Sequence, residues 1–138
     1  MSEAEIITVN GIIIQDRKLL VVKDDGRFVL PGGRMESGES DIETLNREMA
    51  EELGIDVSFG KVELVGYFDF EKAYKSDLRL QMRVYHIQTS QIPQMLDDIT
   101  ELLWLDKGIY KNHNDLPKAW FDVIFEKLLE RNIIDLLN

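Results

Sequence analysis

An acidic helix, bounded by its own start and stop signals, dominates the first half of this sequence. Residues 33–55 read GRMESGESDIETLNREMAEELGI. Ser40 with Glu43 three residues later forms a capping-box pattern, which predicts that a helix begins here. Gly54 predicts the end of that helix, because glycine readily adopts the left-handed conformation that closes many helices. Such a helix needs an apolar partner surface, and this restricts how the rest of the chain can fold.

The two faces of this helix differ in chemistry. Its apolar side chains recur at spacings of three and four residues, as in a buried stripe. They are Ile42, Leu45, Met49 and Leu53. At about 100° per residue, Glu48 and Glu52 lie about 40° apart, and Glu51 lies about 60° from Glu48. Carboxylates this close repel one another, so a divalent cation between them would be stabilising. The alternative is an ordinary solvated acidic face.

Strands are predicted on both sides of the helix. Runs of β-branched and apolar residues predict strands at 6–14, 18–23, 27–30, 62–67, 78–89 and 101–105. The Ile12-Ile13-Ile14 run suggests burial on both faces. We expect Pro31-Gly32-Gly33 to stop regular structure and residues 71–77, 91–98 and 107–115 to be loops. A second helix is expected from Leu116 to about Leu136, with Pro117 in its first turn. A mixed sheet with a helix on each face would bury both apolar stripes.

Size and charge exclude several classes of protein. The 138 residues fit one domain, which we place at 1–138. A net charge of −10 disfavours nucleic-acid binding, because phosphate contacts need a basic surface. There are 0 cysteines, hence no disulfide or thiolate chemistry. The N-terminal segment MSEAEIITVN does not resemble a signal peptide, and no apolar run is long enough to span a membrane. We therefore expect a cytoplasmic protein without a membrane partner.

The acidic segment resembles the Nudix box of the MutT-like Nudix hydrolases, G-x5-E-x7-R-E-U-x-E-E-x-G-U, where U is a bulky aliphatic residue. The fixed positions of that pattern fall on Gly33, Glu39, Arg47, Glu48, Glu51, Glu52 and Gly54, with Ile55 at the last U. Met49 takes the other U position, a departure that keeps bulk and apolarity. The resemblance implies the fold of that family, an α/β/α sandwich with a mixed β-sheet between helices.

The resemblance also implies an activity, the hydrolysis of a pyrophosphate bond in a nucleoside diphosphate linked to another moiety. Water would be the nucleophile and Mg²⁺ or Mn²⁺ the cofactor. Glu48 and Glu52 are then the main metal ligands, Glu51 shares a further ion, and the Gly32 carbonyl is an additional ligand. Either Glu48 or Glu52 could act as general base. The alternative is a non-catalytic Nudix-like module that senses or binds a nucleotide.

Other candidate site residues support or extend this cluster. Arg47 and Glu39 look like a pair that ties the loop to the helix and orients Glu48. Many family members add a carboxylate from a later strand, and Glu101 is the candidate here, with Asp98 behind it. The alternative for Glu101 is an ordinary exposed strand position.

Substrate contacts are expected outside the box. Arg27, just before the glycine pair, is a candidate phosphate contact, although a lone arginine beside a turn is often solvent-exposed. Trp120 is a candidate for stacking on a base, and its alternative is a place in the core. The expected partner is a small nucleotide, with a nucleoside triphosphate as first choice. The apolar tail at 133–137 could pack on the domain or form a homodimer.

Overall fold

The computed structural model describes residues 5–138; residues 1–4, part of the segment considered above for a signal peptide, lie outside it. Its elements are β1 Glu5–Ile12, β2 Ile14–Gln15, β3 Lys18–Asp24, β4 Arg27–Val29, β5 Gly32–Arg34, α1 Asp41–Leu53, the 3-10 helix η1 Val57–Phe59, β6 Lys61–Phe70, β7 Arg79–Gln88, β8 Ile99–Leu105, α2 Lys107–Asn112 and α3 Lys118–Glu130. Among residues 5–138 no helix combines the length and the apolarity needed to cross a membrane.

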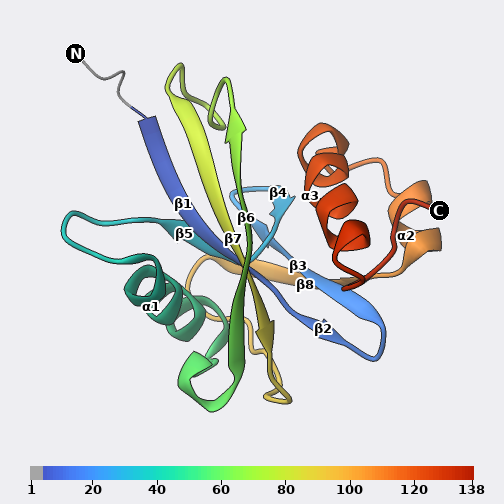
Figure 1. Ribbon diagram of the computed structural model, residues 1–138, viewed down its shortest axis with the longest axis horizontal. Coiled ribbons are helices and arrows are strands. Elements are labelled where there is room, and N and C mark those ends of the chain that lie inside the picture. The colour runs from blue at the N-terminus through green and yellow to red at the C-terminus, as the bar shows by residue number, and fades with distance from the viewer. Residues whose placement is uncertain (1–4) are drawn as a thin grey trace.

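The strands form two sheets between the helices. The first has the order β5-β1-β7-β6, with β1 and β7 parallel and the other neighbours antiparallel. The second joins β2, β3 and β4, with β8 added on β3, and all its pairs are antiparallel. Helix α1 lies on one side of the strands, and α2 and α3 lie on the other (Figure 1). The predicted α/β/α arrangement with a mixed sheet is therefore confirmed.

Strand β3 explains why both sides of this arrangement are apolar. Leu19 and Val21 belong to the core cluster under α3, whereas Leu20 and Val22 belong to the cluster under α1. All four are fully buried, because successive residues of a strand point to opposite faces and both faces are covered. The Ile12-Ile13-Ile14 run behaves alike, with Ile12 on the α3 side and Ile13 on the α1 side.

Helix α1 begins and ends where its local signals predict. Ser40 and Glu43 form both hydrogen bonds of the capping box, and Gly54 closes the helix with φ 66°. Leu45, Met49 and Leu53 are fully buried under the strands. Ile42 is 43% exposed. The predicted stripe is therefore wrong for the first turn, because the core is packed only from Leu45 onward.

Two other predictions are corrected. Residues 32–34 do not leave regular structure but form β5, which pairs antiparallel with β1. Gly32 adopts φ +137°, and a Cβ there would lie 2.2 Å from the Val9 carbonyl oxygen, so only glycine brings these backbones together. Part of the expected loop 107–115 is helix α2. Asp106 caps α2 by accepting a hydrogen bond from the Ile109 N–H. The buried side chain of Tyr110 anchors the helix to the core.

The last helix is shorter than predicted. Helix α3 spans Lys118–Glu130, and Pro117 is its N-cap rather than a residue of its first turn. The chain then turns at Asn132, which has φ 56°, and the tail packs back on the α3 side of the core. Leu136 is 1% exposed. Of the two predicted roles for the tail, the structure shows packing on its own domain.

Candidate functional site

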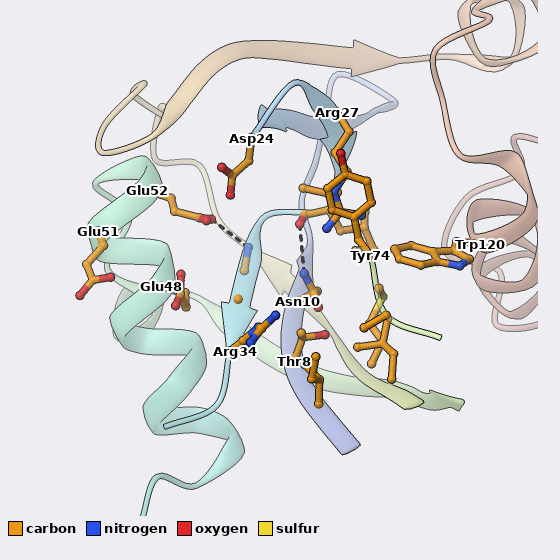
Figure 2. Close-up of a pocket in the computed structure, with 18 of the residues that line it drawn as sticks. Thr8, Asn10, Asp24, Arg27, Arg34, Glu48, Glu51, Glu52, Tyr74 and Trp120 are labelled. Atoms are coloured by element: carbon orange, nitrogen blue, oxygen red, sulfur yellow. Dashed lines mark hydrogen bonds between the residues drawn. The ribbon is translucent and has the colours of Figure 1, made fainter. Parts of the chain in front are cut away.

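A pocket of about 320 Å³ is lined by residues of α1 on one side and by Trp120 of α3 on the other. Figure 2 shows that its two ends differ in chemistry. Glu48 and Glu52 point from α1 toward β5 at one end, whereas Glu51 lies on the outer side of the helix. The rings of Tyr74 and Trp120 lie at the other end. Strand β1 supplies Thr8 and Asn10 between them. The pocket can therefore hold an elongated ligand with a cation-binding group at one end and a flat group at the other.

Glu52 is the deepest carboxylate at the acidic end. It is 6% exposed, and its Oε2 accepts a hydrogen bond from the Gly32 N–H at 2.9 Å. Burial raises its pKa to about 8; the Gly32 bond opposes this shift, while the charges of Glu48, Asp24 and Asp97 add to it. A buried carboxylate among other carboxylates is strongly favoured by a bound cation, which removes the repulsion.

Glu48 lies against the glycine strand. Its side chain is 14% exposed, and a Cβ on Gly33 would stand only 2.6 Å from its carboxyl carbon. Burial raises the pKa of Glu48, with the hydrogen bond from Arg47 acting against that shift. Glu51 is more open, with a side chain 51% exposed. Glycine at position 33 therefore makes room for the Glu48 carboxylate.

Arg47 ties these parts together. Its Nε and Nη2 donate to the two oxygens of Glu39 at 2.8 and 2.9 Å, a bidentate pair. Its Nη1 donates to Glu48 Oε1 at 2.8 Å, and Nη2 also donates to the Arg34 carbonyl at 3.0 Å. The hydrogen bond from Arg47 is the main reason that the pKa of Glu39 falls to about 2. One guanidinium thus joins the loop, β5 and α1, and holds one oxygen of Glu48.

We expect Glu39→Gln to lower thermal stability at pH 7 and to lose that effect in acid. The pKa of Glu39 is about 2 in the folded protein, below its ordinary value of 4.5. Its carboxylate therefore contributes stability above pH 4.5 that disappears as the pH falls to about 2. Melting temperatures of both proteins, measured by circular dichroism between pH 7 and pH 2, should converge. A difference that stays constant over this range, or one equally large for the exposed control Glu126→Gln, would contradict the ion-pair interpretation.

The donor set at the acidic end suits a hard divalent cation. Carboxylates and backbone carbonyls are the ligands that Mg²⁺ and Mn²⁺ take in proteins. Among residues 5–138 no three acidic or histidine side chains are already gathered around one point. Glu48 is engaged by Arg47 and Glu52 by Gly32, so an ion would have to draw their free oxygens together. The chemistry of these residues therefore fits the cofactor. Its oxygen ligands would come from one helix, α1, and one strand, β5.

Glu101 does not join this cluster. It is an exposed residue of β8, opposite Lys23 of β3, and it does not line the pocket, so its alternative as an ordinary strand position holds. Asp97, in the loop before β8, and Asp24, at the end of β3, line the pocket instead. Burial and the charge of Asp98 raise the pKa of Asp24. The sequence analysis did not identify Asp24 and Asp97 as site residues. The one signal that could have indicated them is that each is an acidic residue at the end of a predicted strand or shortly before one.

The far end of the pocket brings Arg27 and Trp120 together, with Tyr74 as an unpredicted third member. The Arg27 guanidinium carbon lies 3.7 Å from the Tyr74 ring centroid and 5.4 Å from that of Trp120. Burial lowers the pKa of Arg27. Trp120 is half-buried and packs against Phe70, so it belongs to the edge of the core and to the pocket wall at once. The alternative of a place in the core thus holds in part, and stacking of Trp120 on a base stays a prediction.

Comparisons with known proteins agree with this architecture. The NUDIX domain family model matches residues 5–110. A Nudix hydrolase of Nostoc sp. is 36% identical over 75 residues, which are 54% of this chain and 43% of that protein, so the match spans less than half of the relative. The fold is similar to a MutT protein from Methanosarcina mazei (TM-score 0.80, 23% identity, covering 96% of this chain and 98% of the other). It is also similar to the NUDIX domain of Shewanella oneidensis NrtR, solved with ADP ribose (TM-score 0.73, 19% identity, 95% and 90% covered).

Proposed function

This chain belongs to the NUDIX domain family, and we propose that it hydrolyses a pyrophosphate bond in a small nucleotide. The substrate class is a nucleoside diphosphate linked to another group, with nucleoside triphosphates as the first choice. One observation carries the proposal: Glu52 is a buried acidic group among like charges, in a pocket of about 320 Å³ whose lining also includes Tyr74 and Trp120. Such an arrangement is unfavourable by itself and would be relieved by a divalent cation, which can also bind the pyrophosphate.

Mg²⁺ or Mn²⁺ is the proposed cofactor. Glu48, Glu51, Glu52 and the Gly32 carbonyl would hold it, in keeping with the preference of these ions for oxygen ligands. A bound ion would neutralise charge on the pyrophosphate and acidify the attacking water. Glu48 or Glu52 would accept the proton of that water. These carboxylates share one rigid helix, which suits a reaction that depends mainly on positioning and electrostatics.

The remaining residues are proposed to orient the reacting groups. Arg47 fixes one oxygen of Glu48 through their 2.8 Å hydrogen bond, which leaves the other oxygen free. Trp120 would stack on the base. Arg27, the predicted phosphate contact, lies at the same end of the pocket as Trp120, so we propose that it flanks the base instead. The similarity to a NUDIX domain solved with ADP ribose supports a nucleotide of this general size. Because the tail 133–137 packs on its own domain, it offers no argument for a homodimer.

A substrate panel tests the proposal directly. We expect nucleoside triphosphates or diphosphate-linked nucleotides to be hydrolysed in the presence of Mg²⁺ or Mn²⁺, and turnover to stop when EDTA is added. Chromatography of the products identifies the broken bond, and ¹⁸O-labelled water identifies the phosphorus that was attacked. Saturable binding of one nucleotide without turnover under any metal condition would instead favour a nucleotide-sensing module. Absence of both binding and turnover across the whole panel would refute both functions.

A further inference from the structure

Two polar side chains of β1 reach the pocket with an unpartnered oxygen each. Thr8 Oγ1 and Asn10 Oδ1 are buried and have no hydrogen-bond partner, and both residues line the pocket. They stand two positions apart on one strand, so their side chains point to the same face. Asn10 is 6% exposed. Buried polar atoms are almost always paired in folded proteins, so two neighbouring exceptions in one pocket point to a ligand that pairs with them.

The chemistry of the missing partner follows from Asn10. Its Nδ2 donates to the Leu30 carbonyl at 3.0 Å and approaches the Pro31 carbonyl at 3.5 Å (Figure 2). The opposite amide orientation would set two carbonyl oxygens against the Asn10 oxygen, so the hydrogen-bond pattern fixes Oδ1 on the free side. Oδ1 can only accept a hydrogen bond. The ligand must therefore present an N–H or O–H donor at this point, while the Thr8 hydroxyl can donate or accept.

The surroundings of these two oxygens suit a flat heterocycle. Leu80 and Met82 of β7 supply apolar wall beside them. Arg27, stacked on Tyr74 and close to Trp120, presents flat surfaces at the pocket edge. Aromatic and guanidinium planes are the usual stacking partners of nucleobases. The carboxylates of α1 lie at the opposite end of the same pocket, where a diphosphate would meet its cation (Figure 2).

We propose that Thr8 and Asn10 read the hydrogen-bonding edge of a nucleobase, with Asn10 Oδ1 accepting from an amino or ring N–H group of that base. The base is flanked by the Arg27–Tyr74–Trp120 surface, and the phosphates extend toward Glu48 and Glu52. This inference rests on the proposed function for the direction of the substrate. It adds the residues that select the base, none of which belongs to the acidic segment.

Binding of nucleosides, which lack phosphate, tests the subsite apart from hydrolysis. In a Trp104→Phe background, Trp120 is the remaining tryptophan and reports binding by its fluorescence. Adenosine, guanosine, cytidine and uridine are titrated without metal. The best-bound nucleoside is then compared with an analogue that lacks the donor, such as purine riboside for adenosine. We expect the analogue to bind about tenfold more weakly, because it leaves a buried acceptor unpaired.

Variants of Thr8 give the matched control. Thr8→Val removes the hydroxyl while keeping the shape, and we expect it to weaken binding of the best nucleoside about tenfold; Thr8→Ser keeps the hydroxyl and should bind nearly as wild type. Absence of nucleoside binding, no preference for the donor, or equal binding by Thr8→Val and wild type would overturn the base-reading role. If any of these occurs while wild type still hydrolyses nucleotides, only this inference fails. Base-selective binding without metal-dependent turnover would instead refute the proposed hydrolase.

Discussion

Glu52→Gln is expected to reduce kcat about 10³-fold while the protein stays folded, a loss of the size seen when one preorganised electrostatic group is removed. The reason is the position of Glu52. Its carboxylate is buried at the acidic end of the pocket, where an ion would need its negative charge. The glutamine side-chain oxygen can still accept the Gly32 N–H, so the glycine strand should keep its place. Turnover of the best substrate with Mg²⁺, together with a thermal melt, measures both effects.

The stability measurement makes this result interpretable. Burial raises the pKa of Glu52 to about 8, so folding of the metal-free protein at pH 7 costs either the uptake of a proton or the burial of a charge. A neutral amide avoids both costs, so the metal-free variant should melt no lower than wild type at pH 7. Glu126→Gln on α3, an exposed position outside the pocket lining, is the matched control for the same chemical change. Wild-type turnover in a folded Glu52→Gln protein would remove Glu52 from the metal site.

Local signals explain which parts of the fold could be predicted. Helix α1 carries its start in Ser40 and its end in Gly54, so neither depends on distant residues. Helix α2 has one such signal, the Asp106 N-cap, but its sequence is short and polar and Tyr110 is its one buried residue. Strand β5 consists of Gly32, Gly33 and Arg34, which have little intrinsic preference for strands. It forms because β1 offers a free edge, which is a tertiary effect.

The same distinction applies to the candidate site. Residues of the acidic segment are recognisable together because one helix and the loop before it position them. Asp24 and Asp97 enter from separate elements. The pairing of β3 with β8 brings the ends of those elements together, and backbone hydrogen bonds from Gln94 and Leu96 to the last two carbonyls of α1 hold the loop before β8 against the end of that helix. That pairing also sets Glu101 opposite Lys23 and away from the pocket. The register between β3 and β8 determines that Asp97, and not Glu101, reaches the carboxylates of α1, and the sequence alone does not specify this register.

Chemistry and selectivity are therefore encoded in different parts of the chain. The acidic end depends on α1 and β5, which one continuous segment supplies. The other end combines Thr8 and Asn10 of β1 with Arg27, Tyr74 and Trp120 from three further regions. Substrate choice is accordingly a property of the assembled fold rather than of the segment that identifies the family.

Gly33→Ala should separate the position of Glu48 from its chemistry. An alanine Cβ would stand 2.6 Å from the carboxyl carbon and Oε1 of Glu48, and 2.7 Å from Oε2, so the carboxylate must move. Displacement of a reacting group by about 1 Å can lower the rate about 10²-fold, and we expect a loss of that order in kcat/KM. Because the obstacle is the end of a flexible side chain, the fold should survive. Steady-state kinetics and a thermal melt measure the two effects.

The control is the same substitution where no carboxylate is in the way. Gly108→Ala places its Cβ 3.5 Å from the nearest atom outside its own helix backbone and neighbours, Asp106 Oδ1, and α2 does not line the pocket. It should leave kcat/KM unchanged and, because alanine favours a helix, melt no lower than wild type. Calorimetric titration with Mn²⁺ adds a readout besides turnover, since a displaced Glu48 should weaken Mn²⁺ binding to Gly33→Ala. Wild-type kinetics and Mn²⁺ affinity in a folded Gly33→Ala protein would show that the contact between Gly33 and Glu48 does not set the active geometry.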